Sequence, residues 1–171
     1  MIERMLGAAL LNPKAFEEVE ADQSATKQAL VIVVLASIAT GIGTPNTTIG
    51  IATTISAVLL AIIGWALWAW ITYFVGTKLL RTEATEANWG QLARTLGFAQ
   101  SPGLFKVFGI IPVIGPYIFI TVVFWQLAAQ IIAIRQALDY TSTLRAIAVA
   151  IIGFIPYAML MSILYSLLSQ G

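Results

Sequence analysis

The residues of this chain that could do chemistry gather in its last quarter, where Arg135, Asp139, Tyr140 and Arg145 stand close together in sequence. An enzyme built on them would use a tyrosine, a serine or a carboxylate as its reactive group. Nucleophilic catalysis requires a nucleophile paired with a base, and no such pair is evident here. We therefore predict that the protein is not an enzyme and that it has no catalytic residues.

The residue types that are missing exclude further chemistry. The sequence has Cys 0 and His 0, so it can form no disulfide, thiolate metal site or cysteine nucleophile. No imidazole can ligate haem, zinc or a chlorophyll-type pigment, or act as a general base. We predict no cofactor and no bound metal ion. The net charge of +1 gives no support for nucleic-acid binding.

The composition is that of a protein embedded in a membrane. The 171 residues are 59% hydrophobic and 10% charged, with a mean hydropathy of +0.90. Soluble domains are typically about 25% charged, so a chain this apolar cannot cover a water-exposed surface. We predict an all-α integral membrane protein that forms one helix bundle. No signal peptide is evident in the first residues.

Residues 1–23 are predicted to form a helical segment at the membrane interface or in the cytoplasm. Apolar residues recur there at the spacing of an interfacial helix: Ile2, Met5, Leu6, Ala9 and Leu10. Asn12 and Pro13 are typical of the N-cap and first position of a second helix. That second helix is either a solvated cap or a docking surface on which Phe16 and Val19 contact a partner.

Five apolar runs define a membrane domain over residues 24–171. We predict crossings at about residues 24–44, 49–80, 102–115, 117–138 and 144–168. A crossing needs about 20 apolar residues, so the third of these spans is short, and Pro112 interrupts it. Thr47 or Thr48 can cap the second of these helices, and Asn88 can cap a short interfacial helix that precedes the third. The aromatic residues near the end of the second run form either a belt at the membrane interface or a binding pocket. They are Trp65, Trp68, Trp70, Tyr73 and Phe74.

The segment from Thr95 to Pro116 decides the topology, because it could be a soluble loop, a loop that dips into the membrane, or a broken span. If it crosses, all nine basic residues lie on one side, with Lys106 just inside the membrane boundary. If it only dips, Arg135 and Arg145 move to the other side. The positive-inside rule favours the crossing. We therefore predict five spans, with the N-terminus inside and the C-terminus outside.

The fourth run carries small and amide side chains on one helix face. These are Gln126, Ala129, Gln130, Ala133 and Ala137. Small residues allow two helices to approach closely, and amides can form hydrogen bonds between helices. This face is either a helix-contact seam or a polar path that contacts a substrate.

The order of these elements resembles the Yip1 domain family in its short prokaryotic form. The resemblance lies in the "NPKAFEEVEAD" segment, the five apolar runs, and the stretch "VFWQLAAQIIAIRQALDYTSTLRAIAV". Gly97, Phe98, Ser101 and Pro102 are similar to the family's motif of Gly, aromatic, small, variable, small and Pro. The Asp-Leu-Tyr-Gly-Pro type motif and the long cytosolic N-terminal region of eukaryotic relatives are absent. The resemblance therefore does not bring small-GTPase binding to this chain.

Two functional hypotheses remain. The leading one is a non-enzymatic accessory or scaffold subunit of a larger membrane assembly in the plasma or inner membrane. It would act through lateral helix contacts with other membrane subunits, with copies of itself and with membrane lipid. The alternative is a transporter, a channel or a lipid-handling protein, because broken spans often line binding sites. Against a coupled transporter, no ionisable residue is expected deep in a span.

Overall fold

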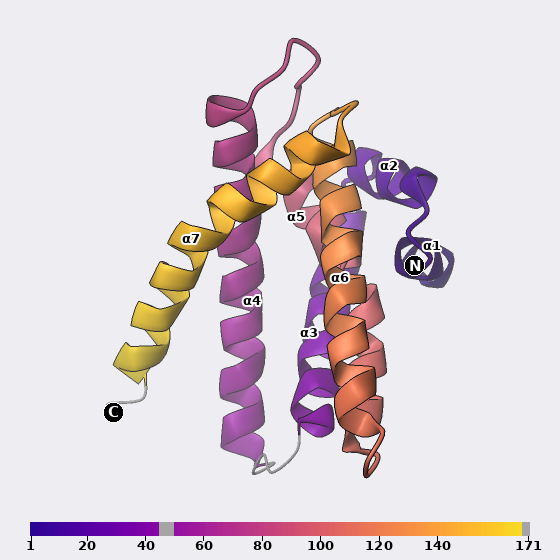
Figure 1. Cartoon of the computed structure of the whole chain (residues 1–171), viewed down its shortest axis with the longest axis vertical. Coiled ribbons are helices and arrows are strands. Elements are labelled where there is room, and N and C mark those ends of the chain that lie inside the picture. The colour runs from indigo at the N-terminus through magenta and orange to yellow at the C-terminus, as the bar shows by residue number, and fades with distance from the viewer. Residues whose placement is uncertain (45–49, 169–171) are drawn as a thin grey trace.

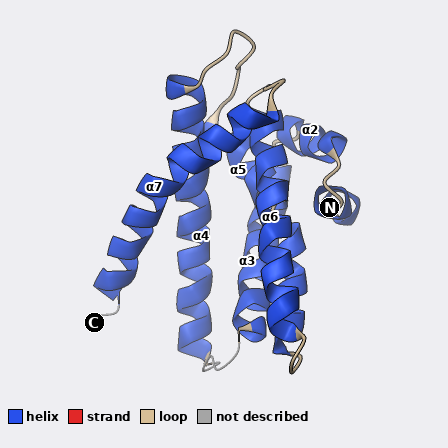
Figure 2. Ribbon diagram, viewed as in Figure 1, coloured by secondary structure: helices blue, strands red, loops and turns tan. Residues whose placement is uncertain are grey.

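The computed structural model describes residues 1–44 and 50–168, and all regular structure in these ranges is helical (Figures 1 and 2). The elements are α1 (Ile2–Ala9), α2 (Pro13–Ala21), α3 (Ala25–Gly43), α4 (Ile51–Phe74), the π-helical turn η1 (Val75–Leu79), α5 (Trp89–Phe98), the 3₁₀ helix η2 (Ser101–Ile110), α6 (Gly115–Ala137) and α7 (Thr143–Leu168). The prediction of an all-α chain is thus confirmed. The expected caps Thr47 and Thr48, and the start of the second run at residue 49, lie outside the described residues.

Four helices within the described ranges are long and apolar enough to cross a membrane. They are α3, α4 together with η1, α6 and α7 up to Leu167. The predicted third crossing at 102–115 is not among them. Its residues form η2 and a turn that leads into α6, and ten residues of 3₁₀ helix rise only about 20 Å. The five-crossing arrangement therefore stays a prediction.

The α5–η2 stretch nevertheless runs beside α3 along most of its length. Three glycines of this stretch face three small residues of α3, spaced seven residues apart. The facing pairs are Gly97 with Ala29, Gly103 with Ala36, and Gly109 with Gly43. Residues 29 and 43 of a helix lie about 21 Å apart along its axis. The chain thus descends from the start of α3 to its end before it turns into α6 (Figure 1).

This geometry corrects the predicted place of Lys106. The sequence interpretation put Lys106 on the same side as Arg94, but its backbone contacts Gly43 at the far end of α3. Its ammonium group lies 5.3 Å from the ring centroid of Phe119, near the start of α6. The prediction was wrong because α5 already forms part of the descending stretch and a 3₁₀ helix rises faster per residue than an α-helix. The other eight of the nine basic residues belong to segments at the α2 end.

The main core lies at the α2 end, where α2 packs on α5 and α6. Phe16 and Val19 are fully buried there, in one cluster with Leu92, Leu96 and Leu138. The two side chains proposed as contacts for a partner are therefore used inside the chain itself. The pattern of α2 correctly marks an apolar face, but a single sequence does not say whether that face meets another protein or a neighbouring helix.

Candidate functional site

A cleft of about 1070 Å³ lies between α3, α4, α6 and α7. It exists because α7 packs on α4 near the α2 end and then leans away from the bundle toward its C-terminus (Figure 1). The contact between the two helices is close at Gly153, which faces Trp68 and Ile71. Beyond it, the wall is formed by apolar side chains and by a few polar groups that come mainly from α6 and η2.

Two glutamines of α6 form the polar part of this wall. Gln126 is only 7% exposed, and its Nε2 donates a hydrogen bond of 2.6 Å to Oε1 of Gln100 at the start of η2. Gln130 lies one turn further along α6 and also faces the cleft. Its side-chain amide has no hydrogen-bond partner among residues 1–44 and 50–168. An unpaired amide in a membrane-embedded wall favours an occupant with polar atoms.

The small residues of the same helix have a different place. Ala129, Ala133 and Ala137 are fully buried, and α6 packs against α2, α5 and η2. The predicted seam thus divides in the structure. Its alanines pack against the chain's own helices, whereas Gln126 and Gln130 face the cleft.

The aromatic residues of α4 also divide between two places. Trp65 and Trp68 line the cleft, together with Tyr157 of α7. Nε1 of Trp65 donates to the carbonyl of Ala93 at 2.8 Å, and the rings of Trp68 and Tyr157 meet edge to face at 5.3 Å. Trp70 is 53% exposed and points away from the core. One part of the aromatic group thus belongs to a pocket wall and another part to the outer surface.

Comparison with known protein families supports the assignment suggested by the order of elements. The Yip1 domain profile matches residues 7–163, which include every wall of the cleft. The chain belongs to the Yip1 family. No curated protein and no solved structure matches it. This Yip1-family chain is a membrane protein with several apolar helices, and its family is not known for enzymatic activity.

The Yip1-like motif forms the junction between α5 and η2. Gly97 packs so closely on α3 that a Cβ at this position would lie 2.6 Å from the Cβ of Ala29. Phe98 is fully buried, and the hydroxyl of Ser101 donates to the carbonyl of Phe98 at 2.6 Å. Pro102 stands in the first turn of η2, where its missing N–H is tolerated. The motif fixes the turn that carries Gln100 to the wall of the cleft.

Three of the four residues that could have formed a catalytic group, namely Arg135, Tyr140 and Arg145, make contacts at the turn between α6 and α7. The hydroxyl of Tyr140 lies 3.0 Å from the carbonyl oxygen of Gly76 and 2.9 Å from that of Leu80, so it can donate to either at the end of the π turn. Nε of Arg135 donates to the carbonyl of Tyr140 at 3.2 Å, and Arg145 lies over the Tyr140 ring at 5.8 Å. These contacts tie the α6–α7 turn to the end of α4.

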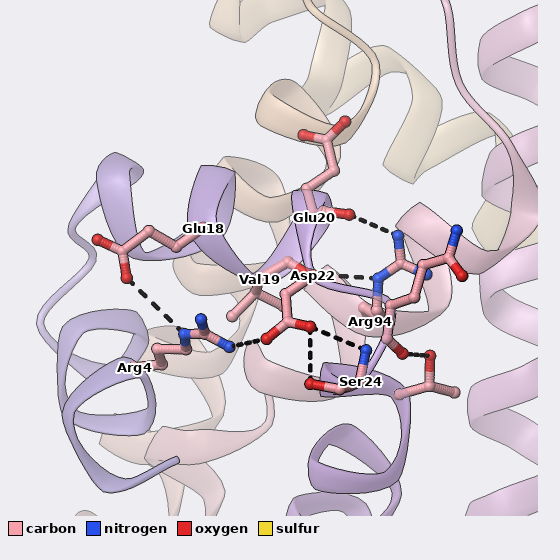
Figure 3. Close-up of polar contacts among 9 residues, drawn as sticks. Arg4, Glu18, Val19, Glu20, Asp22, Ser24 and Arg94 are labelled. Atoms are coloured by element: carbon pink, nitrogen blue, oxygen red, sulfur yellow. Dashed lines mark hydrogen bonds and ion pairs between the residues drawn. The ribbon is translucent and has the colours of Figure 1, made fainter.

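A second polar cluster fastens the N-terminal helices to the bundle (Figure 3). Arg94 of α5 donates to the backbone carbonyls of Val19 and Glu20 near the end of α2. Arg4 of α1 forms an ion pair of 2.6 Å with Asp22. Asp22 also accepts hydrogen bonds from the hydroxyl and the backbone N–H of Ser24, at 2.6 and 2.9 Å. The bonds from Ser24 and then from Arg4 lower the pKa of Asp22 to about 2.

Glu20 is the member of this cluster that titrates near neutral pH. Its carboxylate accepts a hydrogen bond of 2.9 Å from Gln91. Burial raises its pKa from 4.5 to about 7, and the nearby carboxylates of Asp139 and Glu17 add to the rise, while Arg94 opposes it. The folded protein thus binds a proton at Glu20 more tightly than the unfolded chain does.

This shift predicts a pH-dependent stability. Because the folded pKa is raised, the stability contributed by protonated Glu20 is present below pH 4.5 and is lost as pH rises toward 7. Glu20→Gln keeps the hydrogen-bond acceptor and removes the charge. We expect the variant to be more stable than the parent at pH 8, by about 1 kcal/mol because Glu20 is partly exposed, and equal to it near pH 4.5.

Thermal unfolding in detergent at pH 5 and pH 8 measures this difference. Glu83→Gln is the matched control, because Glu83 is exposed on the loop before α5, and we expect its melting temperature to follow the parent's at both values. A difference between Glu20→Gln and the parent that is the same at pH 5 and pH 8 contradicts the assignment.

Proposed function

We propose that this Yip1-family protein crosses the membrane five times and holds a membrane lipid in the cleft between α3, α4, α6 and α7. The proposed location is the plasma or inner membrane, with the α2 end in the cytoplasm. The observation that carries the proposal is the combination of a cleft of about 1070 Å³ with an unpaired glutamine amide on its wall.

The path of the α5–η2 stretch supports the fifth crossing. It stays beside α3 from Ala29 to Gly43, so it reaches the same depth as a helix that is long enough to span. A loop that dipped in and returned would bring the start of α6 back to the α2 end, and α6 starts at the opposite end (Figure 1). The eight basic residues at the α2 end support its cytoplasmic orientation.

The chemistry of the cleft supports a lipid as its occupant. Ligand pockets of proteins typically measure about 300 to 1,000 Å³ and are mostly apolar, with a few placed polar groups. This cleft has mostly apolar walls, with Gln126 and Gln130 among the residues that line it. A lipid supplies an acyl chain for the walls and ester or headgroup atoms for the amide of Gln130.

Filling the cleft tests this proposal. Ala61 lines the cleft from α4, whereas Ala52 is exposed on the same helix and does not line it. We expect the parent, purified in a mild detergent, to retain lipid that native mass spectrometry detects. Ala61→Phe is expected to retain several-fold less, and Ala52→Phe as much as the parent. A parent without lipid, or equal retention in both variants, contradicts the proposal.

The accessory or scaffold role is a second candidate. It is favoured by α4, because only 6% of the most apolar window of this helix is buried inside the chain. Such a face could pack against another membrane subunit or a second copy. Purification from native membranes tests this role, and a defined complex that survives in gentle detergent is the result it predicts. A lone chain under the same conditions contradicts it.

A further inference from the structure

We infer that Lys106 binds the anionic headgroup of the lipid in the cleft and thereby selects anionic over zwitterionic phospholipids. This inference rests on the proposed function. Lys106 is the one charged residue among the described residues that line the cleft. It stands in η2 near the end of the cleft opposite the two tryptophans, beside Gly43 at the end of α3.

Among residues 1–44 and 50–168, no acidic side chain pairs with Lys106. Both ion pairs in the described part of the protein belong to Arg4, and all eight acidic residues lie in segments at the α2 end. The face of Phe119, 5.3 Å from the ammonium, stabilises a cation but does not neutralise it. A cation in apolar surroundings is unfavourable unless an anion accompanies it. A phosphate-bearing headgroup with net negative charge provides that anion.

The position of Lys106 along the cleft fits a headgroup with its acyl chain inside. The residue lies near the end of α3 and the start of α6, where the helices approach the membrane boundary. From there the cleft continues past Gln126 and Gln130 toward Trp65 and Trp68. A phospholipid of the leaflet on this side would place its headgroup at Lys106 and its acyl chain against the apolar wall. Its ester oxygens would then lie near the side-chain amides of Gln126 and Gln130.

The two glutamines alone do not predict a preference for charge, because an amide hydrogen-bonds neutral and anionic groups alike. The ammonium group of Lys106 does favour anionic lipid. A basic side chain near anionic lipid contributes roughly 1 kcal/mol to binding, which corresponds to about a fivefold preference. The selectivity of the bound lipid therefore reports on Lys106, whereas the amount of bound lipid reports on the cleft.

The experiment compares phosphatidylglycerol with phosphatidylcholine of identical acyl chains, added to delipidated protein and counted by native mass spectrometry. We expect the parent to prefer phosphatidylglycerol about fivefold and Lys106→Gln to bind both equally. Lys106→Arg retains the charge and is expected to retain the preference. Lys27→Gln is the control, because Lys27 is exposed near the start of α3 at the other end, and its preference is expected to match the parent's.

The outcomes separate this inference from the proposed function. If the parent binds both lipids equally, or if Lys106→Gln keeps the preference of the parent, the role of Lys106 is overturned and the lipid-binding cleft stands. If the parent binds neither lipid, the proposed function itself is overturned. The comparison within the parent needs no variant, so equal binding of the two lipids overturns the role of Lys106 even where Lys106→Gln does not fold.

Discussion

Gly43→Ala is expected to destabilise the protein by about 3 kcal/mol or more, whereas Gly41→Ala leaves its stability unchanged or slightly raised. The two residues stand two positions apart on α3. A Cβ on Gly43 would overlap the backbone carbonyl of Lys106, and a Cβ on Gly41 meets nothing within 4 Å. Backbone atoms cannot yield as a side chain can, so the first substitution has to separate α3 from η2.

The control substitution, Gly41→Ala, is expected to leave the stability of the protein unchanged or to raise it slightly. Alanine is favoured over glycine in the middle of a helix by roughly 0.5 to 1 kcal/mol. We expect a smaller gain at Gly41, which lies in the last turn of α3 and has open space around it. Thermal unfolding of the two variants in the same detergent measures the contrast. Melting temperatures for Gly43→Ala and Gly41→Ala that agree with each other would contradict the close packing of α3 on η2.

Arg94→Met is expected to weaken the docking of α2 by roughly 3 kcal/mol, because a hydrogen bond from a charged group contributes about 1.5 to 3 kcal/mol. Arg94 is 7% exposed and donates to the carbonyls of Val19 and Glu20. These carbonyls lie at the end of α2, where the helix itself offers no partner. Methionine fills similar space but donates no hydrogen bond, so the carbonyl of Val19 loses its partner in a buried place and that of Glu20 in a partly buried one.

Limited proteolysis and thermal unfolding measure this effect together. We expect the segment before α3 to become cleavable in Arg94→Met and the melting temperature to fall. Arg81→Met is the control, because Arg81 is exposed after η1 and its loss is expected to change neither readout. Equal protection of α1 and α2 in both variants would show that Arg94 does not hold them.

Local signals in the sequence predict the helices and several of their ends. Asn12 caps α2 as its type and the following proline indicate, by accepting a hydrogen bond of 3.1 Å from the backbone N–H of Lys14. Asn88 caps α5 in the same way, with a hydrogen bond of 3.1 Å from Gln91. Side-chain capping depends only on neighbours in the chain, so a single sequence is enough to find it.

Tertiary contacts account for what the sequence does not predict. Lys106 lies closer to the end of α3 than expected because η2 is a 3₁₀ helix separated from α5 by only two residues, and hydropathy does not distinguish the two helix types. The burial of Phe16 depends on which helix covers α2. The alanines and glutamines of α6 share one face in the sequence, and only the packing of α5 and η2 decides that the alanines are covered while Gln130 faces the cleft.

The cleft itself has no signature in the sequence, because it results from the direction of α7. Tyr157 holds α7 to Trp68, and the exposed apolar residues further along α7 would equally suit a helix that packed closely on α4. The resemblance to the Yip1 family predicts the order of the elements and not the space between them.

Photo-crosslinking inside native membranes distinguishes a lipid in the cleft from a protein subunit packed against it. A benzophenone amino acid at position 57, which lines the cleft from α4, is compared with the same amino acid at position 52, which is also exposed on this helix but does not line the cleft. If the cleft holds a lipid, we expect a lipid adduct at position 57 that is several-fold more abundant than at position 52. A protein adduct at position 57, or equal lipid labelling at both positions, would contradict a lipid-holding cleft.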